Sequence, residues 1–362
     1  MFSKKEKKSK KINAMFLSAN ESDEAFMKEL YDCAASALAD KVRPFFRRVT
    51  NFFVLEWIFA VQKNIEYDLV AYMSQYGFLK HTHTKPNKFF TKFYFDCLAK
   101  MHFIKSYAYL RKYNIDVLYV KDDNSISHIA CIVAAHNLKI DVKILHEGYR
   151  NDMLFIDSNA TRFQNSLPRN PEFFKNLQVE QSVEVENKAD NIILVIMQPE
   201  DSVEILVNSP FVKSHKYLLT IIATLAKEHL NYQFVIFHSN YHFQDEENIS
   251  FLDDGFEQFV PNAKAIITVN SHKALYGFEF NKPVIVLGNA FYAMEGLTIP
   301  VTSEEELFNA IDKLDTFEFD ADLAYKYIAF VQTYFTIFCS NTLQPTLDDA
   351  KNIIINTMPT VE

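Results

Sequence analysis

Two carboxylate-bearing segments, each directly after an apolar run, are the first candidates for chemistry. Glu147 lies in the sequence His-Glu-Gly-Tyr-Arg (146–150), where it could act as a general base or accept a hydrogen bond from a substrate hydroxyl. Asp201 lies in Gln-Pro-Glu-Asp-Ser (198–202), where it could attack an anomeric carbon or stabilise an oxocarbenium-like transition state. A surface turn at Glu147 and a turn cap at Asp201 explain the same residues, so spacing alone leaves both roles open.

Groups that could hold a phosphate form a second set. His238 ends the apolar run 232–238 and could donate a hydrogen bond to an anion. Ser271 follows Asn270 where a predicted strand passes into a helix, so free backbone N–H groups there could bind an anion, with Lys273 adding positive charge. Helix capping by Asn270 or Ser271, and a structural role for His238, remain open alternatives.

Two loops could bring rigid groups to a ligand. Arg169 lies between two prolines in the segment 165–171, and such a stiff loop could hold its guanidinium toward a carboxylate or phosphate. The same segment could be a proline turn with a solvent-facing arginine. Gly288 opens a loop, 288–298, in which glycine would allow the backbone to approach a ligand closely.

The elements that would position these residues are predicted by apolar periodicity. A strand, a helix and a second strand are expected at 116–121, 126–138 and 139–148, which is the βαβ unit of a parallel sheet. Four further short strands, with helical patterns between them, are expected at 191–197, 232–238, 263–270 and 282–288. Because loops at the carboxyl ends of parallel strands collect binding groups, we expect a ligand in a cleft between two domains.

The chain length of 362 residues also favours two domains. The pattern from Glu24 to Lys112 is mostly helical, with Ser22 as a candidate cap, and the polar stretch 182–191 predicts a domain boundary near residue 188. Long helices are expected at 321–339 and 347–358. The fold class is therefore predicted as α/β, with two Rossmann-like domains, a cleft between them and C-terminal helices. The predicted divisions are a basic flexible tail at 1–20, an N-terminal helical and Rossmann-like domain at 21–188, a second Rossmann-like domain at 189–320 and C-terminal helices at 321–362.

Composition and charge exclude some classes of function. A net charge of -9 and a pI near 5.7 argue against a general nucleic-acid binder. The four cysteines are far apart and form no CxxC pair, which indicates neither a zinc site nor a disulfide framework and fits a reducing cytoplasm. No segment reaches the roughly 18 apolar residues that a membrane span needs. Six lysines between Lys4 and Lys11 could attract anionic lipid headgroups or form a solvated tail.

Taken in order, these segments resemble the KpsC/KpsS-like family of capsule polysaccharide β-Kdo transferases. The resemblance covers roughly residues 115–300, and its strongest part is the uninterrupted segment from Asn270 to Thr298. It implies a GT-B-like enzyme that transfers Kdo from CMP-Kdo, with retention, to a lipid or Kdo-chain acceptor, without a metal or other cofactor. It also implies that 21–188 is the acceptor domain and that 189–320 is the nucleotide-sugar domain. The implied location is cytoplasmic, peripheral on the inner face of the membrane through the lysine-rich segment, with other capsule-synthesis proteins as partners.

The resemblance also implies roles for individual residues. Glu147 would be the base that activates the acceptor, and Asp201 the nucleophile that forms a covalent sugar adduct. The residues implied at the donor are Gln198, Glu200, His238, Asn270, Ser271, Lys273, Tyr276, Gly288 and Tyr292. Those implied at the acceptor or a sugar are Tyr149, Arg150, Asn165 and Arg169.

The sequence departs from the family pattern at four places. The family's Lys-Pro-His-Pro reads Ile-Phe-His-Ser at 236–239, and its glutamate five residues after the Asn-Ser serine is Tyr276. Asp201 lies three residues after Gln198 rather than four, so the nucleophile could instead be Glu200. The usual Arg-Pro pair reads Arg-Asn at 150–151. Two alternatives therefore stay open: a transferase that uses another nucleotide-activated sugar, such as CMP-sialic acid, and a non-catalytic capsule-assembly scaffold that binds nucleotide sugar.

Overall fold

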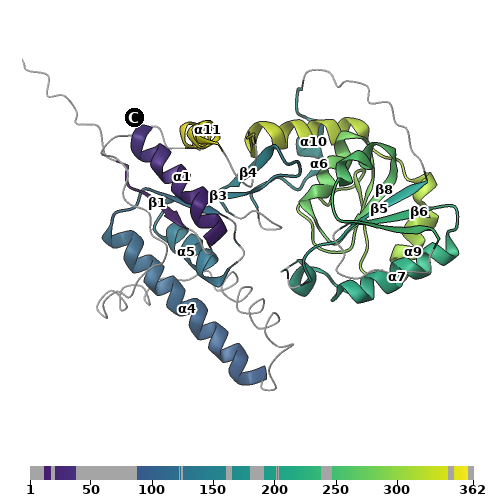
Figure 1. The fold of residues 1–362 in the computed structure, drawn as a ribbon, viewed down its shortest axis with the longest axis horizontal. Helices are drawn as coiled ribbons and strands as arrows, with labels where there is room; N and C mark the ends of the chain where they lie inside the picture. Colours follow the sequence, from purple (N-terminus) through teal and green to yellow (C-terminus); the bar gives the residue numbers. More distant parts are fainter. Residues whose placement is uncertain are drawn as a thin grey trace, which may run out of the picture.

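The chain folds into two α/β lobes, each built on its own sheet (Figure 1). The computed structural model describes residues 12–17, 21–37, 88–121, 123, 125–159, 165–179, 191–200, 202, 204–237, 247–340 and 346–357. The predicted α/β class with two Rossmann-like units is confirmed, since each described sheet contains parallel strands joined by helical crossovers. The predicted boundary near residue 188 and the lysines of 4–11 lie outside the described residues.

The N-terminal lobe has a five-stranded sheet in the order β1-β2-β3-β4-β11. Strands β1 (Ala14–Leu17), β2 (Val117–Lys121) and β3 (Asp141–Glu147) are parallel, and helix α5 (Ile126–Asn137) connects β2 to β3, which confirms the predicted βαβ unit. Strand β4 (Met153–Asp157), which we did not predict, runs antiparallel to β3.

Helices cover both faces of this sheet because successive side chains of a buried strand point to opposite faces. Met15 and Leu17 of β1 pack toward α5 and α4 (Lys88–Lys112), whereas Ala14 and Phe16 pack toward α1 (Glu21–Ala37) and α11 (Leu347–Thr357). Figure 1 shows these two helix pairs on opposite sides of the sheet.

The C-terminal lobe has six parallel strands in the order β10-β9-β8-β5-β6-β7. They are β5 (Ile192–Ile196), β6 (Gln233–Phe237), β7 (Ile249–Leu252), β8 (Ala263–Thr268), β9 (Val284–Val286) and β10 (Thr298–Pro300). The four strands predicted here are confirmed. The chain starts at β5 in the middle, builds outward through β6 and β7, and then returns to the other side at β8. This reversal between β5 and β8 is the topological switch point at which α/β sheets bind ligands.

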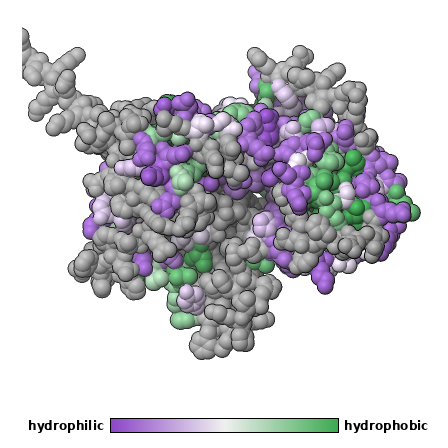
Figure 2. All heavy atoms as spheres, viewed as in Figure 1, coloured by the Kyte–Doolittle hydropathy of each residue, from purple (hydrophilic) through white to green (hydrophobic). Residues whose placement is uncertain are grey.

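Two layers of helices bury this second sheet. Helices α7 (His215–Glu228) and α9 (Glu304–Asp312) pack on one face. Helices α8 (Leu275–Glu279) and α10 (Ala321–Tyr334) pack on the other. Within the described residues, no helix is both long enough and apolar enough to cross a bilayer. Figure 2 shows hydrophilic residues over much of the coloured surface, with an apolar area on the C-terminal lobe.

The end of the chain returns to the N-terminal lobe, and here the helix predicted at 321–339 was wrong in its extent. Helix α10 ends at Tyr334, and β11 (Thr336–Phe338) then pairs antiparallel with β4. The apolar segment after α10 meets an unpaired edge of β4, and backbone pairing there replaces another helical turn. Helix α11, predicted at 347–358, is confirmed and packs against α1.

Two predictions at the N-terminus also need correction. Residues 12–17, which we placed in a flexible tail 1–20, contain β1, whose four side chains are all buried. The segment is ordered because it adds a parallel strand beside β2, with Asn13 receiving a hydrogen bond from the backbone of Asp116. Ser22 is not a helix cap, since α1 already begins at Glu21.

Candidate functional site

The candidate site is built around a mutual pair of amides at the switch point of the C-terminal sheet. Gln198 follows β5 and Asn270 follows β8, and these two strands are neighbours. The Gln198 Oε1 accepts from the Asn270 backbone N–H at 3.0 Å, and the Gln198 Nε2 donates to Asn270 Oδ1 at 2.9 Å. Asn270 Nδ2 also donates to the carbonyl of Asn289 at 2.9 Å. The ends of β5, β8 and β9 are therefore held in one hydrogen-bonded unit.

Helix α7 supports this unit from its N-terminus. Glu200 Oε1 accepts from the backbone N–H of His215 at 3.2 Å, and Ser214 caps the same helix through its side chain. The buried His215 ring makes a hydrogen bond through Nε2 to the carbonyl of Gln198. A carboxylate and a hydroxyl at a helix N-terminus satisfy donors that the helix cannot pair internally. Glu200 thus has a structural partner in the described part of the chain.

Two hydrogen bonds of Ser271 stabilise the loop after β8. Ser271 Oγ accepts from the backbone N–H of Lys273 at 3.3 Å, and the Ser271 carbonyl accepts from the Tyr292 hydroxyl at 2.7 Å. Tyr292 is completely buried, and this burial raises its pKa well above the usual value, so its hydroxyl stays protonated as a donor. The predicted capping alternative for Ser271 is therefore realised.

Gly288 permits two loops to touch. A Cβ there would lie 2.9 Å from Val269 Cγ1 and 3.0 Å from the carbonyl oxygen of Asn208, both closer than ordinary contact. The glycine at position 288 therefore allows the backbone after β9 to pack closely against Val269 and Asn208.

An aromatic group borders the same loops. Lys273 Nζ lies 5.4 Å from the centroid of the Phe256 ring, and Tyr276 packs edge-on against Phe256 and Phe280. Partial burial raises the pKa of Tyr276. The place of the family's glutamate is therefore taken by a neutral ring within an aromatic cluster.

Arg169 joins the N-terminal half of the chain to the loop after β9. Its Nη2 donates to Asn165 Oδ1 at 2.8 Å, its Nη1 donates to the carbonyl of Phe291, and its guanidinium lies 5.8 Å from the centroid of that ring. Burial lowers the pKa of Arg169. The stiff loop predicted from its prolines thus directs the guanidinium to a carbonyl of the C-terminal lobe, and Leu167 and Phe174 of the neighbouring segment pack in the apolar cluster of that same lobe.

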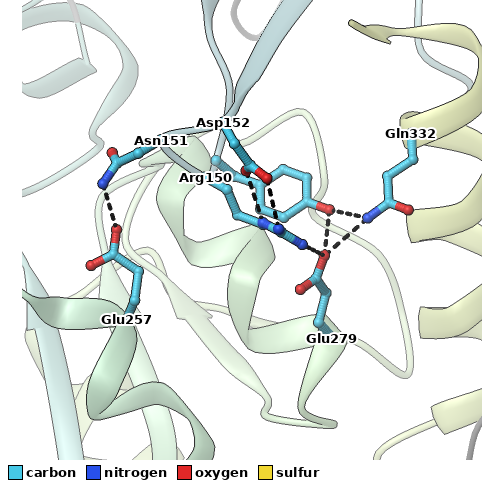
Figure 3. A network of polar contacts seen from close by, with 7 residues as sticks. Arg150, Asn151, Asp152, Glu257, Glu279 and Gln332 are labelled. Atoms are coloured by element: carbon cyan, nitrogen blue, oxygen red, sulfur yellow. Dashed lines mark hydrogen bonds and ion pairs between the residues drawn. The ribbon is translucent and has the colours of Figure 1, made fainter. Parts of the chain in front are cut away.

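The hairpin between β3 and β4 reaches the site from the N-terminal lobe. His146 Nε2 lies 3.4 Å from Nδ1 of His272, and the Phe155 ring also contacts His272 at a centroid distance of 6.1 Å. Glu147, partly exposed at the end of β3, comes directly after His146. Arg150 extends toward Glu279 of α8, as Figure 3 shows, and the Tyr149 hydroxyl donates a hydrogen bond to the same carboxylate.

The structure thus brings together most of the predicted donor-side residues, and it adds partners that the sequence reasoning missed. The missed residues are His215, His272, Glu279, Asn289 and Gln332: three of them lie inside the segment 270–298 but were given no role, and no motif marked His215 or Gln332. Asp201 and His238 lie outside the described residues, and their roles stay predictions. Within the described residues, no group of His, Cys, Asp or Glu is arranged as a metal site.

Two Rossmann-like lobes, a C-terminal segment that returns to the first lobe and a polar cluster at the second sheet's switch point define a GT-B-like protein. Residues 231–335 match the capsule polysaccharide biosynthesis protein family. The predicted resemblance to this family is therefore confirmed over that segment, which runs from β6 to α10. No curated protein is significantly similar in sequence to the chain.

Solved structures with a similar arrangement share little sequence with the chain. The KpsC β-Kdo 2,7 transferase of Thermosulfurimonas dismutans is 15% identical, with a TM-score of 0.41, over 70% of this chain and 88% of that one. The UDP-GlcNAc 2-epimerase of Methanocaldococcus jannaschii is 13% identical, with a TM-score of 0.38, over 89% and 99%. The glycosyltransferase SnogD of Streptomyces nogalater is 11% identical, with a TM-score of 0.34, over 96% and 100%. The functional argument therefore rests on the family match and on the site itself.

Proposed function

We propose that the protein is a glycosyltransferase of capsular polysaccharide synthesis that transfers Kdo from CMP-Kdo, with retention, to a lipid or Kdo-chain acceptor. The observation that supports it best is the linked unit of Gln198, Asn270 and Asn289 at the switch point, because the family match covers two of its three strand ends.

The donor would lie on this unit. Gln198 and Asn270 use part of their hydrogen-bonding capacity on each other, and each amide keeps further capacity for a ligand. Ser271 and, by the resemblance, His238 would hold the phosphate of CMP. The Lys273 ammonium would add positive charge at the same loop. A dianionic donor fits such a set of donors and cations better than a neutral sugar does.

The reaction would proceed through two displacements. The carboxylate of Asp201 would attack the anomeric carbon of Kdo as the bond to the CMP phosphate oxygen breaks, and CMP would leave with that electron pair. The acceptor hydroxyl, losing its proton to Glu147, would then displace Asp201 from the same carbon. Two inversions give net retention. The engagement of Glu200 with the N-terminus of α7 supports Asp201 rather than Glu200 as the nucleophile.

A donor panel tests this proposal. Purified protein would be given CMP-Kdo, CMP-sialic acid and common UDP sugars, with a Kdo-primed lipid as acceptor, and the anomeric configuration of any product would be read by NMR. We expect turnover with CMP-Kdo and a retained configuration. Turnover with a different donor only, or CMP-Kdo binding without turnover, would contradict the proposal and favour a changed donor or a scaffold.

Paired carboxylate variants test the assignment of the nucleophile. Asp201→Asn should abolish turnover and the covalent adduct, whereas Glu200→Gln should keep the adduct because its amide oxygen can still accept from His215. Full activity in Asp201→Asn would remove the nucleophile assignment.

A further inference from the structure

The β3–β4 hairpin is part of the N-terminal sheet, but its tip packs against the C-terminal lobe. Tyr149, Met153 and Phe155 lie in one continuous apolar cluster with side chains of the C-terminal lobe, including Phe278 and Tyr327. Tyr149 is only 1% exposed. The hairpin is thus embedded in the core of the C-terminal lobe.

A partly buried polar network holds the tip there, and Figure 3 labels its members Arg150, Glu279 and Gln332. The Tyr149 hydroxyl donates to Glu279 Oε1 at 2.7 Å and accepts from Gln332 Nε2 at 2.7 Å. Gln332 Nε2 also lies 3.0 Å from the same Glu279 oxygen, and Arg150 Nη1 lies 3.7 Å from it. Helices α8 and α10 of one lobe are thereby tied to a single loop of the other.

The network gives the Tyr149 hydroxyl, the Gln332 amide nitrogen and Glu279 Oε1 hydrogen-bonding partners. The Glu279 carboxylate receives hydrogen bonds from a hydroxyl and an amide and lies near a cation, which a nearly buried charge requires. The Tyr149 hydroxyl uses both its donor and an acceptor position, so little capacity remains for a sugar. Burial and the charge of Glu279 raise the pKa of Tyr149, which keeps the donating proton in place.

The short chain between Tyr149 and Glu147 is stiff. The Gly148 N–H donates to the Met153 carbonyl at 2.8 Å, and the two backbones approach so closely that a Cβ on Gly148 would lie 2.6 Å from Met153 Cβ. Arg150 also forms two hydrogen bonds with Asp152, at 3.1 and 2.8 Å. A displacement of Tyr149 is therefore passed to Glu147, two residues away.

We propose that Tyr149 and Glu279 are positioning residues, whose partly buried hydrogen bond fixes the Glu147 hairpin on the C-terminal lobe. The carboxylate of Glu147 is then held at a set position relative to the ends of β5, β8 and β9. The anchoring itself follows from the contacts described, and only the catalytic benefit rests on the proposed function.

Amide hydrogen exchange tests the anchor without any activity. Tyr149→Phe and Glu279→Gln should each speed exchange across 144–157 by roughly 10-fold or more, since each weakens a hydrogen bond to a charged group. The matched control is Tyr334→Phe, which removes a hydroxyl from an exposed tyrosine of α10 and should leave exchange unchanged. Should Tyr149→Phe fail to fold, Gln332→Met removes one donor and should give a smaller change in the same direction.

Steady-state kinetics test the positioning role. If the wild-type protein turns over a donor, both variants should lower kcat by roughly 10-fold or more while the donor KM stays within about twofold. If amide exchange across 144–157 is as slow in Tyr149→Phe and Glu279→Gln as in the control Tyr334→Phe, the proposed anchoring is contradicted. A raised acceptor KM with unchanged exchange would also overturn it, because Tyr149 would then contact the sugar. Faster exchange in a protein that shows no turnover with any donor would support the anchor and contradict the proposed function instead.

Discussion

Replacing Gly148 by alanine should disrupt the β3–β4 hairpin, because the new methyl group would meet backbone atoms. The added Cβ would lie 2.6 Å from Met153 Cβ, 2.7 Å from its carbonyl oxygen and 2.9 Å from its carbonyl carbon. Backbone atoms cannot rotate away, so the strands must separate by about 0.8 Å to reach a contact of 3.4 Å. This strain costs about 1–3 kcal/mol, and weakening the hydrogen bond from Gly148 to Met153 adds about 1 kcal/mol.

Gly277→Ala provides a matched control. Its added Cβ would lie 2.7 Å from an atom as well, but that atom is Ile266 Cδ1, the end of a side chain, and the next neighbour is 3.5 Å away. Gly277 also lies inside α8, where alanine gains about 1 kcal/mol of helix propensity that offsets the crowding. We expect Gly277→Ala to change the free energy of unfolding by less than about 1 kcal/mol.

The comparison is made by thermal and urea denaturation of both variants, with hydrogen exchange across 144–157 as a local measure. Gly148→Ala should unfold at a lower temperature and at a lower urea concentration, because its free energy of unfolding falls by about 2–4 kcal/mol. Amide exchange in the hairpin should also be faster. Equal stability of Gly148→Ala and wild type would refute the reasoning, since it would mean that the hairpin opens at little cost. If Gly148→Ala and Gly277→Ala lose the same free energy of unfolding, it does not matter whether the new Cβ meets backbone or the end of a side chain.

Three further outcomes are expected. Burial raises the pKa of Asp349, but hydrogen bonds from Ser340 and Thr346 outweigh it and lower the pKa from 3.8 to about 2. This stabilisation is present above pH 3.8 and lost as the pH falls toward 2, so Asp349→Asn should flatten acid unfolding followed by circular dichroism. In thiol titration of the native protein, Cys97 should react first, because it is exposed whereas the other three cysteines are buried with raised pKa values. Gln198→Ala should weaken CMP binding by roughly 10-fold in calorimetry, and an unchanged affinity would place Gln198 outside the donor site.

Much of the candidate site could be predicted from sequence because its residues follow strands. The run 192–196 is apolar and mostly β-branched, the run 263–268 ends in Ile-Ile-Thr, and the parallel arrangement brings their carboxyl ends to one edge. Gln198 and Asn270 could therefore be placed near each other from their positions alone, although they are 72 residues apart.

The limits of the sequence reasoning appear at the ends of elements. The segment after Tyr334 is apolar and short, and such a segment extends a helix or forms a strand with equal ease. Its conformation was decided by the available edge of β4, whose residues lie 181 to 185 positions before their β11 partners in the chain.

Local sequence therefore determined the unit of β2, α5 and β3, the strands β5, β6, β8 and β9, and the polar residues that follow them, since apolar periodicity is a local property. Only the tertiary structure decided that Tyr149 meets Glu279, 130 residues away, and Gln332, 183 residues away. Tyr149 and its two partners come from three elements in two lobes, and the hydrogen bonds between them depend on how the lobes pack. No spacing along the chain encodes that packing.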